Sequence, residues 1–154
     1  MPEERIFTIR GKQPAALAHK KIQLSSADPR AQYSIIEFKI MPAGTPLNSD
    51  QYGIITMGQN NNIDPSDPDM GDQNQIAWAH HSVNQPVPPG IAESVKIYNY
   101  EVLDEKLFAY DGWLHTEDVL NAEEVNYMIK FKRYSTNVEA ASISSIRQYL
   151  VNTA

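Results

Sequence analysis

The side chains best suited to chemistry in this chain are the acids of one polar loop, residues 60–74 (NNNIDPSDPDMGDQN). These acids are Asp64, Asp67, Asp69 and Asp72. Carboxylate and carbonyl oxygens are the ligands that Ca²⁺ prefers, so a calcium site is one interpretation. However, Gly71 is misplaced for an EF-hand and the closing glutamate is absent. Asp-Pro and Asn-rich segments also form turns unaided, and we therefore favour a solvated loop and no resident cofactor.

The four histidines lack a recognisable metal-ligand spacing. His80 and His81 are adjacent, so on a strand they point to opposite faces and cannot bind one metal together. His19 and His115 are isolated in the sequence, and no His-x-His of the cupin type occurs. Because distant strands can converge, a site that joins His115 to His80 or His81, and with it a metal-dependent cupin-like enzyme, stays an alternative.

Motifs for nucleophilic or phosphate chemistry are absent. The chain has no cysteine, no Gly-x-Ser-x-Gly, no P-loop and no Gly-x-Gly-x-x-Gly. Adjacent acids occur at Glu117-Asp118 and Glu123-Glu124, but neighbours on a strand or turn face apart. We interpret them as hydrating the connection between the two pairs, and we predict that the protein is not an enzyme.

Tyrosine dominates the aromatic residues, with eight Tyr against four Phe and two Trp. A group of them surrounds Asp104-Glu105, in a region expected to resemble a hairpin: Tyr98, Tyr100, Tyr110 and Trp113. Core and cross-strand packing is the simplest interpretation. Tyr and Trp also provide contact area at low entropy cost, which makes these four our candidate interface. A sugar-binding platform that also includes Trp78 would use the same residue types.

The composition is that of an acidic globular protein. The chain has 154 residues, 42% of them apolar, and a net charge of −6. This length fits one domain, 1–154, and the charge argues against general nucleic-acid binding. The basic groups Lys20-Lys21 and Lys130, Lys132 and Arg133 are interpreted as solvated sides of strands. MPEER does not begin a signal peptide, and no apolar run approaches the roughly 20 residues of a membrane span.

Apolar residues recur with a period of two along most of the chain, which is typical of half-buried strands. In 125–131 every second residue is apolar, from Val125 to Phe131, and Met128 is the apolar exception on the other side. Further runs lie at 5–10, 22–25, 36–40, 52–57, 75–81, 95–103 and 107–114. Clusters of Pro, Gly, Asn and Asp separate them. About eight strands within 5–135 predict an all-β, antiparallel sandwich, expected to be a single jelly roll.

The last residues change to a helical pattern. Thr136 and Glu139 fit a capping box. Apolar residues then follow at helical spacing: Ile143, Ile146, Tyr149 and Leu150. We expect a short C-terminal α-helix over about 138–150 that covers an edge or end of the sandwich, because an open strand edge invites unwanted pairing.

The C-terminal part of the chain resembles small proteins encoded among the structural genes of tailless and other marine bacteriophages. The similarity lies in the strand at 125–131 (VNYMIKF), the polar link that follows it and the expected helix that ends at 146–151. The resemblance covers the C-terminal part of the chain, and strand-turn-helix is a common motif. It implies a virion-associated β protein, such as a minor capsid, vertex or spike component, and it transfers no functional residues.

We therefore expect a non-enzymatic virion structural protein, made in the host cytoplasm, whose partners are itself, as a homo-oligomer, and other virion proteins. Two alternatives remain at this point. One is a carbohydrate- or ligand-binding β-sandwich module, and the other is the cupin-like enzyme.

Overall fold

The computed structural model describes residues 4–24, 31–84, 96–104 and 111–135, and within these ranges the chain forms strands, turns and loops. The strands are β1 (Glu4–Gln13), β2 (Ala18–Ile22), β3 (Ala31–Pro42), β4 (Asn48–Thr56), β5 (Gln75–Asn84), β6 (Lys96–Leu103), β7 (Gly112–Asp118) and β8 (Val125–Ser135). The predicted all-β class is confirmed. The predicted helix at 138–150 lies outside the described residues. Among those described, no helical segment has the length and apolarity of a membrane span.

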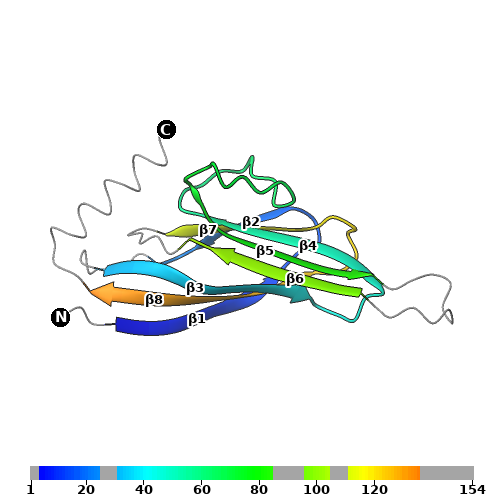
Figure 1. Ribbon diagram of the computed structural model, residues 1–154, viewed down its shortest axis with the longest axis horizontal. Helices are drawn as coiled ribbons and strands as arrows, with labels where there is room; N and C mark the ends of the chain where they lie inside the picture. Colours follow the sequence, from blue (N-terminus) through cyan, green and yellow to red (C-terminus); the bar gives the residue numbers. More distant parts are fainter. Residues whose placement is uncertain (1–3, 25–30, 85–95, 105–110, 136–154) are drawn as a thin grey trace.

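The strands form two antiparallel sheets, which confirms the predicted sandwich (Figure 1). One sheet has three strands in the order β1-β8-β3, and the other has five in the order β2-β7-β4-β5-β6. The first and last strands are paired, with Phe7 opposite Phe131 and Ile9 opposite Ile129. The folded chain therefore brings together residues from its two ends.

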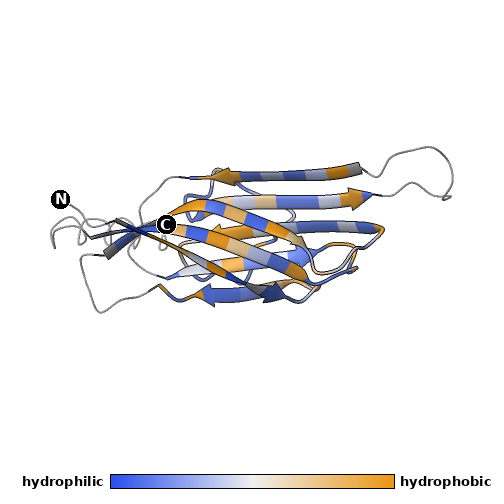
Figure 2. Ribbon diagram, turned by 90° about the horizontal axis from the view of Figure 1, so that it is seen from below, coloured by the Kyte–Doolittle hydropathy of each residue, from blue (hydrophilic) through white to orange (hydrophobic). Residues whose placement is uncertain are grey.

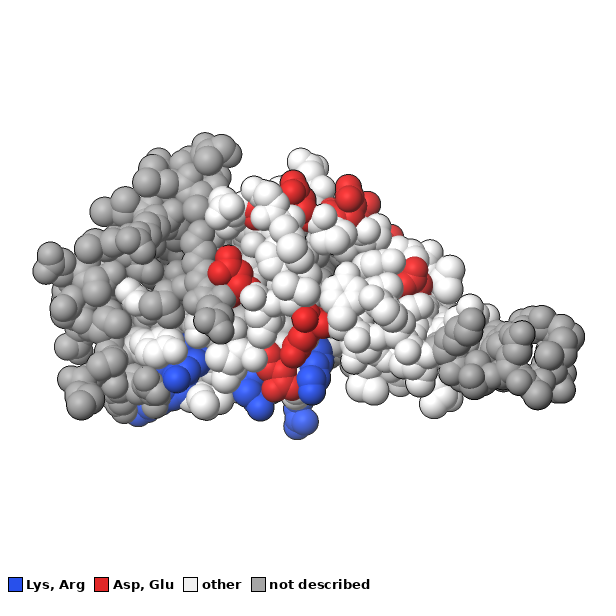
Figure 3. Space-filling view, viewed as in Figure 1, with Lys and Arg blue, Asp and Glu red and all other residues white. Residues whose placement is uncertain are grey.

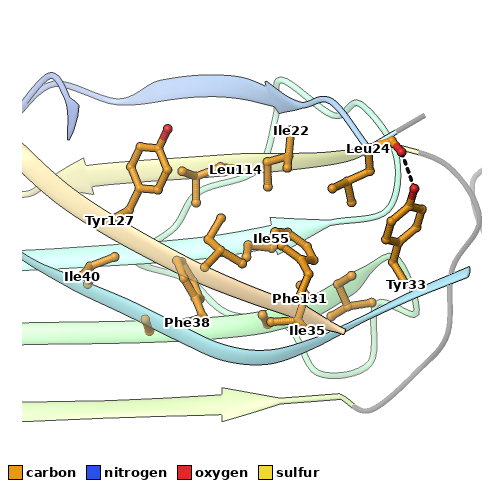
Figure 4. Packing of buried hydrophobic residues seen from close by; sticks show 14 of the residues in the cluster. Ile22, Leu24, Tyr33, Ile35, Phe38, Ile40, Ile55, Leu114, Tyr127 and Phe131 are labelled. Atoms are coloured by element: carbon orange, nitrogen blue, oxygen red, sulfur yellow. Dashed lines mark hydrogen bonds between the residues drawn. The ribbon is translucent and has the colours of Figure 1, made fainter. Parts of the chain in front are cut away.

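Alternation along the strands builds the core between the sheets. Orange and blue residues alternate along the strands in Figure 2. The inward side chains of both sheets interdigitate in Figure 4, where Phe38, Ile55, Leu114 and Phe131 are all fully buried. At one end of the core the Tyr33 hydroxyl donates to the carbonyl of Leu24 at 2.6 Å, so its polar atom is satisfied.

Two strands lie away from their predicted positions. The run predicted at 22–25 is instead β2 at Ala18–Ile22, and the run at 107–114 becomes β7, which continues to Asp118. β2 is an edge strand, and the backbone hydrogen bonds of its antiparallel pairing with β7, rather than an apolar face, hold it in the sheet. β7 lies between β2 and β4, and its polar residues Thr116 and Asp118 are buried, so periodicity did not reveal it.

The sheets approach closely where Gly53 of β4 faces Phe38 of β3. A Cβ atom at position 53 would lie 2.8 Å from Cζ of the Phe38 ring, closer than ordinary packing allows. At the neighbouring edge, the backbone N–H of Phe38 donates to the Glu101 carboxylate of β6 at 2.8 Å. A side chain thus connects β3 to β6, which belong to different sheets.

Asp118, at the end of β7, organises the loops at one end of the sandwich. Its side chain is 2% exposed. It accepts hydrogen bonds from the backbone N–H groups of Leu120 (3.0 Å) and Glu123 (3.2 Å) and from the Gln51 side-chain amide (3.3 Å). The prediction that the Glu117-Asp118 pair is hydrated is therefore wrong for Asp118. Its carboxylate is buried and is hydrogen-bonded to these protein donors, which order the chain around it.

Candidate functional site

The outer face of the five-stranded sheet carries the polar and aromatic side chains that could form a site. Ile55 and Leu114 point into the core, so the residues that alternate with them point away from it. The cross-strand registers place these outward residues in rows, with Glu117, Tyr52, His80 and Tyr100 in one row and His19, His115, Ile54 and Trp78 in the next.

The most compact group on this face is the tyrosine cluster, which we define as Asp50, Tyr52, His80, Tyr98 and Tyr100. The Tyr52 and His80 rings stack at 4.1 Å between centroids, and the His80 and Asp50 side chains lie 2.6 Å apart (Nε2 to Oδ1). Tyr98 and Tyr100 meet the His80 ring at 5.5 Å each and each other at 5.8 Å. Four aromatic rings thus hold one another in fixed orientations.

The electrostatics of the tyrosine cluster favour contact over covalent chemistry. Burial and the neighbouring Asp50 raise the pKa of Tyr52, and burial and Tyr98 raise that of Tyr100. Their hydroxyls therefore stay protonated near neutral pH and act as hydrogen-bond donors and acceptors. Tyr98 is 59% exposed, so its ring is available to a partner.

A second group joins His19 of β2 to His115 of β7. Their Nδ1 atoms lie 2.6 Å apart, and Nε2 of His115 lies 2.9 Å from Oγ1 of Thr56. The Thr56 hydroxyl in turn donates to the carbonyl of Gly58 at 2.7 Å. Burial, and to a lesser extent the electrostatic effect of the neighbouring His19 ring, lowers the pKa of His115 to about 4. Burial therefore keeps His115 neutral near neutral pH, and both of its ring nitrogens are used within this chain of polar groups.

The loop of residues 60–74, which we call the acidic loop, is built from turns that use its own carboxylates. Asp64 accepts from the backbone N–H and hydroxyl of Ser66, Asp69 from the N–H of Gly71, and Asp72 from the N–H of Asn74. These are the local bonds by which aspartate forms turns. Among the described residues, no group of three or more His, Asp or Glu side chains is arranged to hold a metal ion.

The acidic loop is anchored on the outer face by a small apolar cluster of Ile54, Ile63 and Trp78. The Trp78 indole donates to the Gln75 side chain at 2.8 Å, and the same oxygen accepts from the N–H of Asp69 at 3.0 Å. Burial and the nearby Asp64 raise the pKa of Glu117. The loop therefore extends over the sheet as far as β7.

The structure separates the residues of the predicted interface. Tyr98 and Tyr100 are neighbours on β6, but Trp113 lies on β7, with β4 and β5 between them. The region around Asp104-Glu105 therefore does not pair β6 with β7 as a hairpin, and Tyr110 lies outside the described residues. Trp78 is 6% exposed and cannot serve as a platform.

The histidines also differ from the expected arrangement. The partner of His115 is His19, which the sequence left isolated, whereas His80 belongs to the tyrosine cluster one row away. Sequence reasoning missed Asp50, Tyr52 and His80 as a unit. Alternation on β4 and β5 would place each on the outer face, but only the register brings Tyr52 opposite His80.

Comparisons with known proteins assign this chain to no family. No protein-family model matches it, and no curated protein matches it.

Proposed function

We propose that this chain is a structural protein of a virus particle, a non-enzymatic single jelly roll that acts by self-assembly. The observation that carries the proposal is the nested order of its strands. β1 pairs with β8, β2 with β7 and β4 with β5, so the chain folds back on itself from its ends toward its middle. This nesting is typical of jelly rolls, the fold of many viral capsid proteins and also of lectin and cupin domains.

One departure from the ideal topology concerns the remaining pair, β3 and β6. They lie in different sheets and are joined through Glu101 and Phe38 rather than by a backbone ladder. In Figure 1, β6 nevertheless lies beside β3, where the two sheets meet. The jelly-roll assignment therefore rests on the other three pairs.

The filled interior supports a structural role over a cupin-like enzyme. The space between the sheets holds Phe38, Ile55, Leu114 and Phe131, all at 0% exposure. A barrel enzyme holds its ligand in an interior cavity, whereas His80 and His115 here lie on the outer face of one sheet. The acidic loop uses its carboxylates in turns, which likewise favours scaffold over metal chemistry.

Exposed apolar side chains support assembly. Hydrogen bonds join three loops at one end of the sandwich, from Asp118 to Ala15, from Val119 to Asp50 and from Ala43 to Glu124. These loops and the adjoining strand end expose Leu17, Met41, Leu47, Val119 and Leu120. Clustered exposed apolar residues mark interaction sites on soluble proteins. Leu47 and Leu120 are therefore our candidates for contacts between subunits.

The test measures the mass of the purified full chain by light scattering over a range of concentrations, with electron microscopy of the assembled fraction. We expect a defined oligomer or particle. Leu47→Asp with Leu120→Asp should dissociate it, whereas Thr45→Asp with Asn121→Asp, which adds the same charge at exposed polar positions of the same loops, should not. A monomer at every concentration would contradict the proposal.

The tyrosine cluster favours carbohydrate binding as a second candidate function. The exposed Tyr98 ring packs against Tyr100 and His80, and His80 contacts the Asp50 carboxylate, so the cluster combines a stacking surface with a hydrogen-bond acceptor. Binding on a glycan array that is lost in Tyr98→Ala would support this function. An array without any binding, in buffer with calcium, would remove it.

A further inference from the structure

Opposite faces of the sandwich carry opposite charge. The outward side chains of the three-stranded sheet include Arg10 and Lys12 of β1, Lys39 of β3, and Lys130 and Lys132 of β8, which we call the basic face. The opposite side of the molecule carries the acidic loop, with Glu117 beside it. In Figure 3, red side chains line the upper side of the molecule, and blue ones, with some red among them, lie along its lower side.

From this segregation we propose that copies of the chain stack head to tail, with the acidic loop of one copy on the basic face of the next. The inference rests on the proposed function, because it names a second contact between subunits besides the one through Leu47 and Leu120. The two surfaces differ, so the contact is heterologous and can repeat along a row of subunits or close into a ring.

Apolar side chains on the two surfaces complement each other in the same way as the charges. Met70 is 60% exposed within the acidic loop, and Ile6 and Met41 are exposed on the basic face. Met128 lies between them on the central strand of that sheet, opposite Arg10 and Lys39. Protein interfaces commonly combine exposed apolar side chains with charged ones in this way.

The acidic loop is also preorganised for binding. Its aspartates are held in turns, and Ile63 anchors it against Ile54 and Trp78. A rigid protruding loop loses little conformational entropy when it docks. It can therefore present its charges without refolding.

A nucleic acid fits the basic face less well than a second copy does. The Glu37 carboxylate lies between Lys39 (2.8 Å) and Lys130 (3.2 Å) and lowers the positive charge at the centre of the face. Exposed Ile6 and Met41 interrupt the charges toward the two ends of the face. A phosphate backbone is bound through a continuous basic surface, whereas a loop that carries both Asp and Met matches this mixture.

The test uses two variants of the full chain, which we call the reversal variants, each with altered charge on one of the two surfaces. The first is Arg10→Glu with Lys12→Glu, two exposed positions on edge strand β1. The second is Asp67→Lys with Gln73→Lys, two exposed loop positions. Asp67 contributes its backbone N–H to the loop turns, so the reversal leaves those turns intact. Arg10→Lys with Lys12→Arg is the matched control, because it keeps the charge.

Sedimentation velocity is measured at roughly 0.01 M and roughly 1 M salt, where the screening length is about 30 Å and about 3 Å. We expect the wild type and the control to associate more strongly at low salt than at high salt. Each reversal variant alone should associate at least roughly tenfold more weakly. A mixture of the two should associate again, because the intact acidic loop of the first variant then meets the intact basic face of the second.

The outcomes separate this inference from the proposed function. An oligomer whose association changes neither with the reversal variants nor with salt would overturn the stacking, while the proposal of self-assembly would remain. A monomer under every condition overturns both. Failure of the mixture to associate overturns the pairing of these two surfaces. Binding of an oligonucleotide that the Arg10→Glu with Lys12→Glu variant loses, without self-association of the wild type, would assign the basic face to a polyanion instead.

Discussion

The imidazole rings of His19 and His115 face each other across two strands, with 2.6 Å between their Nδ1 atoms. The Thr56 hydroxyl donates its hydrogen bond to the carbonyl of Gly58, so it accepts a hydrogen bond from Nε2–H of His115. Nδ1 of neutral His115 is then the acceptor, and Nδ1 of His19 is the donor. One threonine thereby determines the tautomers of two histidines that lie 96 residues apart.

This arrangement predicts a loss of stability in mild acid. The pKa of His115 is lowered from 6.5 to about 4 in the folded protein. Between these two pH values the unfolded chain therefore binds a proton at this histidine, whereas the folded chain does not. The contribution of His115 is therefore complete above pH 6.5 and declines toward pH 4, by up to about 3 kcal/mol. Urea denaturation across this range should show a steeper decline for the wild type than for His115→Gln. Equal slopes would refute the assignment.

Replacement of Asp118 should destabilise the end of the sandwich that carries its loops. Asp118→Ala removes the acceptor for Leu120, Glu123 and Gln51, and buried donors without partners are costly. We expect a loss of about 3 kcal/mol in the free energy of unfolding. Asp67→Ala, at an exposed position, serves as the control and should change it by less than about 0.5 kcal/mol. Similar values for both variants would show that the carboxylate does not organise the loops.

The close contact of Gly53 with Phe38 predicts that even a methyl group is not tolerated there. Gly53→Ala should lower the free energy of unfolding by about 1–3 kcal/mol, because the new Cβ overlaps the ring. Phe38→Leu alone should also destabilise the protein. The double variant should be more stable than the sum of the two losses predicts, since the smaller side chain makes room. Additivity in this double-mutant cycle would argue against the steric explanation.

Removal of calcium should leave the acidic loop unchanged. Its carboxylates already accept hydrogen bonds from the amides of Ser66, Gly71 and Asn74. The thermal unfolding midpoint should therefore be the same in EDTA and in millimolar calcium. Asp64→Ala should cost about 1 kcal/mol through loss of its turn, with or without calcium. A midpoint that rises with calcium and is lost in Asp64→Ala would establish the calcium site instead.

The amino-acid sequence by itself determined the class of structure. Alternation such as that from Val125 to Phe131 needs only the local rule that successive strand residues face opposite sides, so the strands and the core residues Phe38 and Ile129 followed from it. The same rule failed for β2 and β7, where Lys20-Lys21 and Thr116 carry no apolar period. There the backbone ladders of neighbouring strands supply the order.

Only the tertiary structure decided which residues meet. Tyr52 and His80 stack because β4 and β5 pair in one register, and His19 meets His115 because β2 pairs with β7. Registers depend on long-range contacts, and a shift by one residue would move every side chain to the other face. The charge difference between the two outer faces has the same origin. Arg10 and Lys130 are far apart in the chain and become one surface only when β1 and β8 close the sheet.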